Sequence, residues 1–212
     1  MTTQLALYNN ALLLIGERNL ASLAENREPR RVLDAVWNDD AIKRCLEQGS
    51  WNFAIRTVRL DYEPSIQPDF GYQYAFEHPD DYVRLLGLSL DEYFNTPNND
   101  YADEAGYWYA SNSELYVRYV SMDASYGGDL SRWPGTFCEY VEHYLASKAV
   151  KRLTNNQTDQ EVLKRDLKRK LTDARSKDAL NDPVGFPPPG NWTRSRMGGN
   201  QRDGGNRNKL IG

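Results

Sequence analysis

The chain has 212 residues with 26 basic and 30 acidic side chains, which gives a formal net charge of −4 at pH 7. Without its last thirty residues it keeps about 180, enough for one domain with a single core. Neither an export signal nor a membrane span is expected, because the early apolar run at residues 11–15 is far too short to cross a bilayer.

Apolar side chains at helical spacing predict two helices at the start of the chain. The first covers residues 3–16, where Gly16 provides a stop, and is expected to be short and largely buried. The second covers residues 29–48, because Pro29 suits a first turn and apolar side chains continue to Leu46. Its apolar positions nearly encircle it, so contacts on more than one side are expected.

After Trp51 the apolar period changes to two, which predicts β-strands. The strand candidates are residues 58–62, 72–76, 82–90, 107–110 and 115–120. The last two are expected to pair as a hairpin through residues 111–114, and the polar loop 95–106 is expected to be exposed. The region of about 53–120 is therefore predicted to be a small antiparallel sheet lobe.

Helical spacing returns over residues 134–153 and again over residues 158–180. Thr158 and Glu161 match a capping box at the start of the second of these helices. Its outer faces are crowded with lysine and arginine, which favours a solvated face over a phosphate-binding one. The predicted fold class is α+β: a bundle of N- and C-terminal helices with an inserted antiparallel sheet lobe, in one domain over residues 1–182.

Two cysteines, Cys45 and Cys138, lie in predicted helices among apolar neighbours. They are expected to be buried thiols rather than a disulfide or a metal pair, which fits an intracellular folding environment. The 14 tyrosines and 5 tryptophans suit either cross-strand aromatic pairs or surfaces that are half buried against another protein.

Residues 183–212, called the C-terminal arm below, have the composition of a segment that is ordered only when a neighbour holds it. The arm is rich in proline and glycine and carries a formal charge of +4. It could bind the acidic body of a neighbouring copy, an acidic partner or nucleic acid, the last being the least favoured, or it could wrap its own domain. The candidate partner-binding residues of the arm are Phe186, Trp192, Arg194, Arg196 and Arg202.

No pattern specific for catalysis, cofactor binding or phosphate binding is present in the sequence. Glu139 and His143 lie one helical turn apart, but two ligands without a third are a weak metal signal. Carboxylates that could form a hydrolase pair are Asp39, Asp40, Glu47, Asp80 and Asp81, and each is also explained as a surface charge. The protein is therefore expected not to be an enzyme and to need neither a cofactor nor a metal.

Several segments, taken in order, resemble the bacteriophage head-to-tail adaptor proteins of the tail tubular protein A type. Near the start these are residues 11–17, residues 20–25 and Gly49-Ser50-Trp51-Asn52-Phe53-Ala54. Later they are Pro79-Asp80-Asp81-Tyr82-Val83-Arg84-Leu85, Val117-Arg118-Tyr119-Val120, Trp133-Pro134 and residues 145–149. The resemblance covers about residues 5–182, and the shared order of the motifs carries it.

This resemblance implies a virion structural protein at the head–tail junction, made in the host cytoplasm. Copies would form a ring, twelve-fold in this expectation, that joins the capsid portal to the tail nozzle and possesses a channel for DNA exit. The expected partners are other copies, the portal, the nozzle and tail fibre proteins, with DNA passing without sequence-specific binding and no DNA-binding residues assigned. The alternatives are a tail-associated peptidoglycan hydrolase and a nucleic-acid-binding protein with a basic arm.

Overall fold

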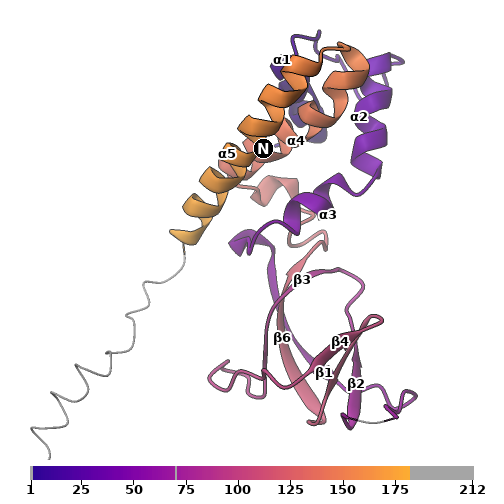
Figure 1. Cartoon of the computed structure of the whole chain (residues 1–212), viewed down its shortest axis with the longest axis vertical. Helices are drawn as coiled ribbons and strands as arrows, with labels where there is room; N and C mark the ends of the chain where they lie inside the picture. Colours follow the sequence, from indigo (N-terminus) through magenta and orange to yellow (C-terminus); the bar gives the residue numbers. More distant parts are fainter. Residues whose placement is uncertain (1, 70, 182–212) are drawn as a thin grey trace, which may run out of the picture. The chain divides into compact units, whose positions relative to one another are not determined.

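The computed structural model describes residues 2–69 and 71–181, and these residues form a mixed α+β structure (Figure 1). The helices are α1 (Gln4–Leu14), α2 (Glu28–Asn38), α3 (Ala41–Leu46), α4 (Gly135–Leu153) and α5 (Gln157–Ala179). The strands are β1 (Ile55–Asp61), β2 (Tyr74–Glu77), β3 (Tyr82–Ser89), β4 (Ala102–Glu104), β5 (Tyr107–Ala110) and β6 (Glu114–Ser121). The predicted α+β class with a sheet inserted between helical segments is confirmed.

Residues 2–54 and 122–181 form what we call the helical lobe, with α4 at its centre. Helix α4 packs against α1, α2, α3 and α5. It can do so because buried side chains lie on several of its faces; they include Phe137, Val141, Leu145, Ala149 and Val150. Helices from the two ends of the chain therefore share one core, as the apolar stripes predicted.

The prediction of one continuous helix over residues 29–48 is wrong. Helix α2 ends at Asn38 and α3 begins at Ala41, with a turn at Asp39 and Asp40 between them. Asp40 has φ of +55°, a left-handed conformation that aspartate adopts more readily than most residues. The apolar positions that seemed to encircle one helix belong to two helices with different orientations.

Helix α5 begins earlier than the predicted capping box. The N-cap is Asn156, whose Oδ1 accepts hydrogen bonds from the backbone N–H groups of Thr158 and Asp159 at 3.0 and 3.4 Å. Its Nδ2 donates to Asp159 Oδ2 at 2.7 Å. Asparagine is as good an N-cap as serine or threonine. The helix is therefore capped two positions before Thr158, and its first residue is Gln157.

Three aromatic rings join α3 and α4 to the start of the sheet. Phe137 lies 4.8 Å from Trp51 and 4.9 Å from Trp133 between ring centroids, in edge-to-face arrangements. The indole N–H of Trp51 donates to Leu46 O at 3.0 Å. A Cβ on Gly49 would lie 2.7 Å from the Trp51 ring, so glycine is required where the chain turns under this tryptophan.

Residues 55–121, called the sheet lobe, contain two antiparallel three-stranded sheets rather than the single sheet predicted. The strand orders are β1-β6-β3 and β2-β5-β4. Buried side chains from both sheets form a second core, whose largest members are Trp108, Tyr119 and Phe76. Alternation along β6 places Leu115, Val117 and Tyr119 in this core.

The predicted hairpin of residues 107–110 with 115–120 is also wrong. Strand β5 pairs with β2 and β4, and β6 pairs with β1 and β3. Trp108 and Leu115 lie in the same core but on different sheets, so the chain crosses between sheets at residues 111–113. The free energy gained by burying the apolar faces of β5 and β6 in two different sheets outweighs the local preference for a tight hairpin turn.

The loop predicted over residues 95–106 is partly a strand. Residues Ala102–Glu104 form β4, and Pro97 makes an isolated bridge with Ser89. Asn98 is buried, and its backbone N–H donates to Leu88 O at 2.9 Å. The polar composition of this segment hid the strand because β4 is short and lies at a sheet edge.

Candidate functional site

The residues proposed as a metal pair lie on the surface of α4. His143 Nδ1 lies 2.8 Å from the backbone oxygen of Glu139, and Glu139 Oε2 accepts a hydrogen bond from Lys170 Nζ at 2.6 Å. The lysine lowers the pKa of Glu139, although partial burial opposes this shift. Among residues 2–69 and 71–181, no cluster of three or more potential His, Cys, Asp or Glu ligands occurs.

Asp81 holds the turn between β2 and β3 against the first sheet. Its Oδ1 accepts from Tyr119 Oη at 2.9 Å, and its Oδ2 accepts from Arg56 Nη1 at 2.9 Å and from Ser121 Oγ. Burial tends to raise the pKa of Asp81, but the hydrogen bonds from Ser121, Arg56 and Tyr119 outweigh it and lower the pKa. These bonds fully engage the carboxylate in a structural network.

The remaining hydrolase candidates have separate environments. Asp39 forms an ion pair with Arg44 at 2.9 Å, with both side chains largely exposed. Asp40 and Glu47 are exposed beside α3, and Asp80 is exposed in the turn before β3. Each is accounted for as a surface charge, as its sequence context suggested.

His78 contacts the aromatic core of the sheet lobe. Its ring lies 4.0 Å from Trp108 and 4.6 Å from Tyr82 between centroids, and its Nε2 is 3.4 Å from Asp103 Oδ1. Burial lowers the pKa of His78, with the nearby Asp103 acting in the opposite direction. No pattern noted in the sequence indicated this cluster.

Both cysteines are free and buried, as predicted. Burial raises the pKa of the Cys45 thiol to about 12, so this thiol stays protonated at neutral pH. Leu46, Trp51 and Phe137 are almost fully buried in the core of the helical lobe, while Trp37 is half buried and packs edge-to-face on Tyr8 at 5.7 Å.

Helix α1 presents an uncharged face to solvent. The helix contains no acidic or basic residue, and its exposed side chains are Ala6, Asn10, Leu13 and Leu14. Leu13 is 71% exposed and Leu14 is 41% exposed, although the adjacent Leu12 is fully buried. The prediction that this helix is largely buried is therefore wrong for one side of it, which we call the α1 face.

The outer face of the β2-β5-β4 sheet carries alternating tyrosine and acidic or small side chains. In the strand register, Tyr109 lies between Ala75 and Ala102, and Tyr107 lies between Glu77 and Glu104. Residues one position away, such as Trp108, point into the core instead. The small neighbours leave one side of the Tyr109 ring open.

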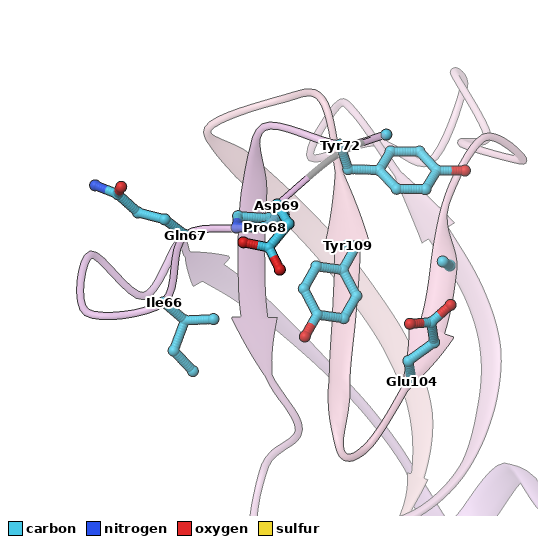
Figure 2. A pocket seen from close by; sticks show the side chains of 9 residues that line it. Ile66, Gln67, Pro68, Asp69, Tyr72, Glu104 and Tyr109 are labelled. Carbon is cyan, nitrogen blue, oxygen red and sulfur yellow. The ribbon is translucent and has the colours of Figure 1, made fainter.

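A cavity of about 350 Å³ lies between this face and the loop that precedes β2 (Figure 2). Its walls include Ile66, Pro68 and Asp69 from the loop, Tyr72, and Glu104 with Tyr109 from the sheet. In the view of Figure 2 the Tyr109 ring stands between Asp69 and Glu104. This volume is at the lower end of the roughly 300–1,000 Å³ typical of ligand pockets. We call this cavity the tyrosine pocket.

The tyrosine pocket lies in the most acidic part of the described chain. The sheet lobe has 4 basic and 12 acidic side chains, a formal charge of −8, whereas the helical lobe has 17 basic and 16 acidic ones. Neither Asp69 nor Glu104 forms an ion pair with any residue that the structure describes. Asp100, which accepts from Tyr72 Oη at 3.2 Å, adds a third carboxylate nearby.

The predicted partner-binding residues of the arm, Phe186, Trp192, Arg194, Arg196 and Arg202, lie outside the described residues. The α1 face and the tyrosine pocket were missed from the sequence. One signal was available, because residues 2–16 contain no charged side chain. None of the helices that the structure describes is both long and apolar enough to cross a membrane.

Comparison with known proteins adds no relative to this picture. No protein-family model matches the chain, and no curated protein matches it significantly.

Proposed function

We propose that the chain is a structural virion protein of a tailed bacteriophage, a ring-forming adaptor that joins the capsid portal to the tail nozzle. The shared order of sequence motifs supports this family. The observation that carries the proposal is the α1 face, an uncharged surface with two exposed leucines on a helix that has no charged residue.

A second copy of the same chain is the proposed occupant of the α1 face. A solvated helix usually covers its outer side with charged residues, as α5 does with its exposed lysines and arginines. Exposed leucines on a helix that has no charged residue of its own are instead typical of a surface that another protein covers. In a closed ring each copy meets two neighbours, so one such face per copy can seal every junction.

Charge distribution suits a channel for DNA as well. Residues 1–182 carry a formal charge of −8, and like charge discourages DNA from adhering to a channel wall. The ring would therefore guide the duplex without binding a sequence.

The α1 face is tested by reversing its character. Leu13→Glu with Leu14→Glu should abolish ring formation by full-length protein, because the glutamates would lose their hydration in the interface. Lys164→Glu with Lys168→Glu on α5 is the matched control, since it also places two glutamates on an exposed helix. Particle mass in solution, with and without portal, is the measurement. Rings that form equally well with both pairs of changes would refute the proposed interface.

Nucleic-acid binding remains a second candidate because of one observation on α5. Lys164, Arg165 and Lys168 are exposed and form no ion pair within the described part of the chain. If DNA binding were the function, affinity would fall steeply with salt, and Lys164→Glu with Lys168→Glu would remove it. If the chain is an adaptor, we expect the assembled ring to bind DNA weakly and Lys164→Glu with Lys168→Glu to leave that binding unchanged.

A further inference from the structure

We propose that the tyrosine pocket binds the basic C-terminal arm of a neighbouring copy, with Arg194 and Arg196 as the residues that enter it. The inference rests on the proposed ring only for the identity of the neighbour. The pocket chemistry and the arm sequence support the match independently of any ring.

The pocket chemistry selects a cation on an apolar stem. Asp69 and Glu104 line the cavity and lack a cationic partner in the described residues. Tyr72 and Tyr109 supply ring faces, and Ile66 with Pro68 supplies apolar wall. An arginine side chain satisfies all three features, because its guanidinium pairs with carboxylates, stacks on aromatic rings and carries a three-carbon stem.

The arm provides such side chains at suitable spacing. Trp192, Arg194 and Arg196 alternate along the sequence, so an extended chain would direct all three to one side. Within the sequence, the arm has a formal charge of +4 and the sheet lobe −8, so long-range attraction acts in the same direction.

A neighbouring copy is the occupant we commit to because exchange of arms would link each copy to the next. In an assembled ring the local concentration of a neighbour's arm is high, which makes weak individual contacts effective. Binding of a chain's own arm, or of a basic segment from another protein, gives different outcomes in the test below.

The test uses two full-length variants that are mixed and exposed to a mild oxidant. One carries Gln67→Cys at the pocket, and the other carries Gly198→Cys, which lies two positions beyond Arg196 and therefore on the same side of an extended chain as the two arginines. A disulfide-linked heterodimer is the expected product, and Asn38→Cys on the helical lobe replaces Gln67→Cys as the positional control. The native thiols Cys45 and Cys138 are buried and should not compete.

Charge reversal tests the recognition itself. Asp69→Lys with Glu104→Lys in the pocket variant should lower the cross-link yield at least about tenfold, because two charge-assisted contacts become repulsive. Asp80→Lys with Glu92→Lys makes the same change in net charge at exposed positions outside the pocket and should change the yield less than about twofold. Arg194→Glu with Arg196→Glu in the arm variant should lower the cross-link yield by a similar factor and leaves the sheet lobe unchanged. When this arm variant is mixed with the pocket variant that carries Asp69→Lys and Glu104→Lys, the charges are opposite again and cross-linking should be restored.

A third variant that carries both Gln67→Cys and the arm cysteine in one chain reports binding of a chain's own arm. Three results would overturn the proposal: equal cross-linking from Asn38→Cys, a yield that does not change on charge reversal in the pocket, or a cross-link that forms only within the double-cysteine chain. Particle mass measured on the same samples separates this proposal from the ring. Rings without the specific cross-link would refute the arm contact alone. Cross-linked pairs that never form larger particles would support the arm contact and refute the ring.

Discussion

The two lobes differ in how they hold their carboxylates, and the difference predicts how each responds to acid. The helical lobe centres on Trp51, Trp133 and Phe137 and also buries the carboxylate of Asp178. The sheet lobe holds Asp81, which accepts three side-chain hydrogen bonds, and His78 beside its aromatic rings. Apolar burial does not depend on pH, whereas the hydrogen bonds of an ionised carboxylate do. We therefore expect acid to weaken the sheet lobe through Asp81, and the packing of the three aromatic rings in the helical lobe to be insensitive to pH.

The lobes also differ on their surfaces. The helical lobe is nearly neutral and exposes the uncharged α1 face, while the sheet lobe has a formal charge of −8 and exposes the tyrosine pocket. An apolar contact persists at high salt, and a contact between opposite charges weakens. The assembly proposed for the α1 face should therefore resist salt, whereas the binding of a basic segment proposed for the tyrosine pocket should weaken as salt is added.

Truncation of the central aromatic ring should have the largest effect on the helical lobe. Phe137→Ala should lower the free energy of unfolding by about 3–5 kcal/mol, because the ring is 1% exposed and packs near four other aromatic residues. Denaturant unfolding measures this loss, which should be the same at pH 4.5 and pH 7. A loss below about 1 kcal/mol would mean that the ring is not packed as described.

Two adjacent leucines separate the core from the α1 face. Leu12→Ala should cost about 2–5 kcal/mol of monomer stability, whereas Leu13→Ala should cost less than about 0.5 kcal/mol because Leu13 is 71% exposed. Leu13→Ala should nevertheless clearly weaken assembly, which is measured as particle mass against protein concentration. Equal effects of Leu13→Ala on both measurements, or none on assembly, would contradict the assignment of this face.

The sheet lobe should depend on the charge of Asp81. Asp81→Asn should cost about 1–3 kcal/mol, because it weakens bonds to Arg56, Tyr119 and Ser121 and leaves the guanidinium without its counter-charge. The folded pKa of Asp81 is lowered, so its contribution is present above the unfolded value of about 3.9 and is lost as the pH falls through the folded value. Amide exchange of β1, β3 and β6 as a function of pH measures this loss by strand. Exchange rates that rise first in α4 would reverse the comparison.

His78 should give the smallest of these effects and at higher pH. Burial lowers the folded pKa of His78, so the unfolded chain binds more protons as the pH falls below about 6.5, and stability declines over that range. His78→Gln removes this titration and should flatten the pH dependence of stability between pH 7 and pH 5. Matching profiles for His78→Gln and the unchanged protein would show that His78 does not contribute.

Sequence periodicity was sufficient for the helices and for the presence of a sheet, since both follow from the spacing of apolar residues. It was not sufficient at Asp39 and Asp40, because aspartate in a left-handed turn leaves the surrounding helical pattern intact. Nor could it assign β5 and β6 to separate sheets, because the sheet to which a strand belongs is decided by long-range burial around Trp108 and Tyr119.

The candidate surfaces were harder to predict than the fold. Leu12 and Leu13 are the same residue type side by side, and only the packing of α1 on α4 decides that one is buried and the other exposed. The tyrosine pocket combines a loop and a sheet face that are separated by more than thirty residues in the sequence, from Pro68 to Glu104. No local pattern encodes that proximity. The uncharged stretch of residues 2–16 was the only available sign of the α1 face.

Electron microscopy of the purified full-length protein, alone and mixed with its portal, tests the central claim most directly. The account predicts closed rings in which the α1 face of each copy is covered by the next copy, and loss of those rings for Leu13→Glu with Leu14→Glu. A protein that stays monomeric in the presence of portal, with Leu13 still accessible to solvent, would contradict the proposed ring.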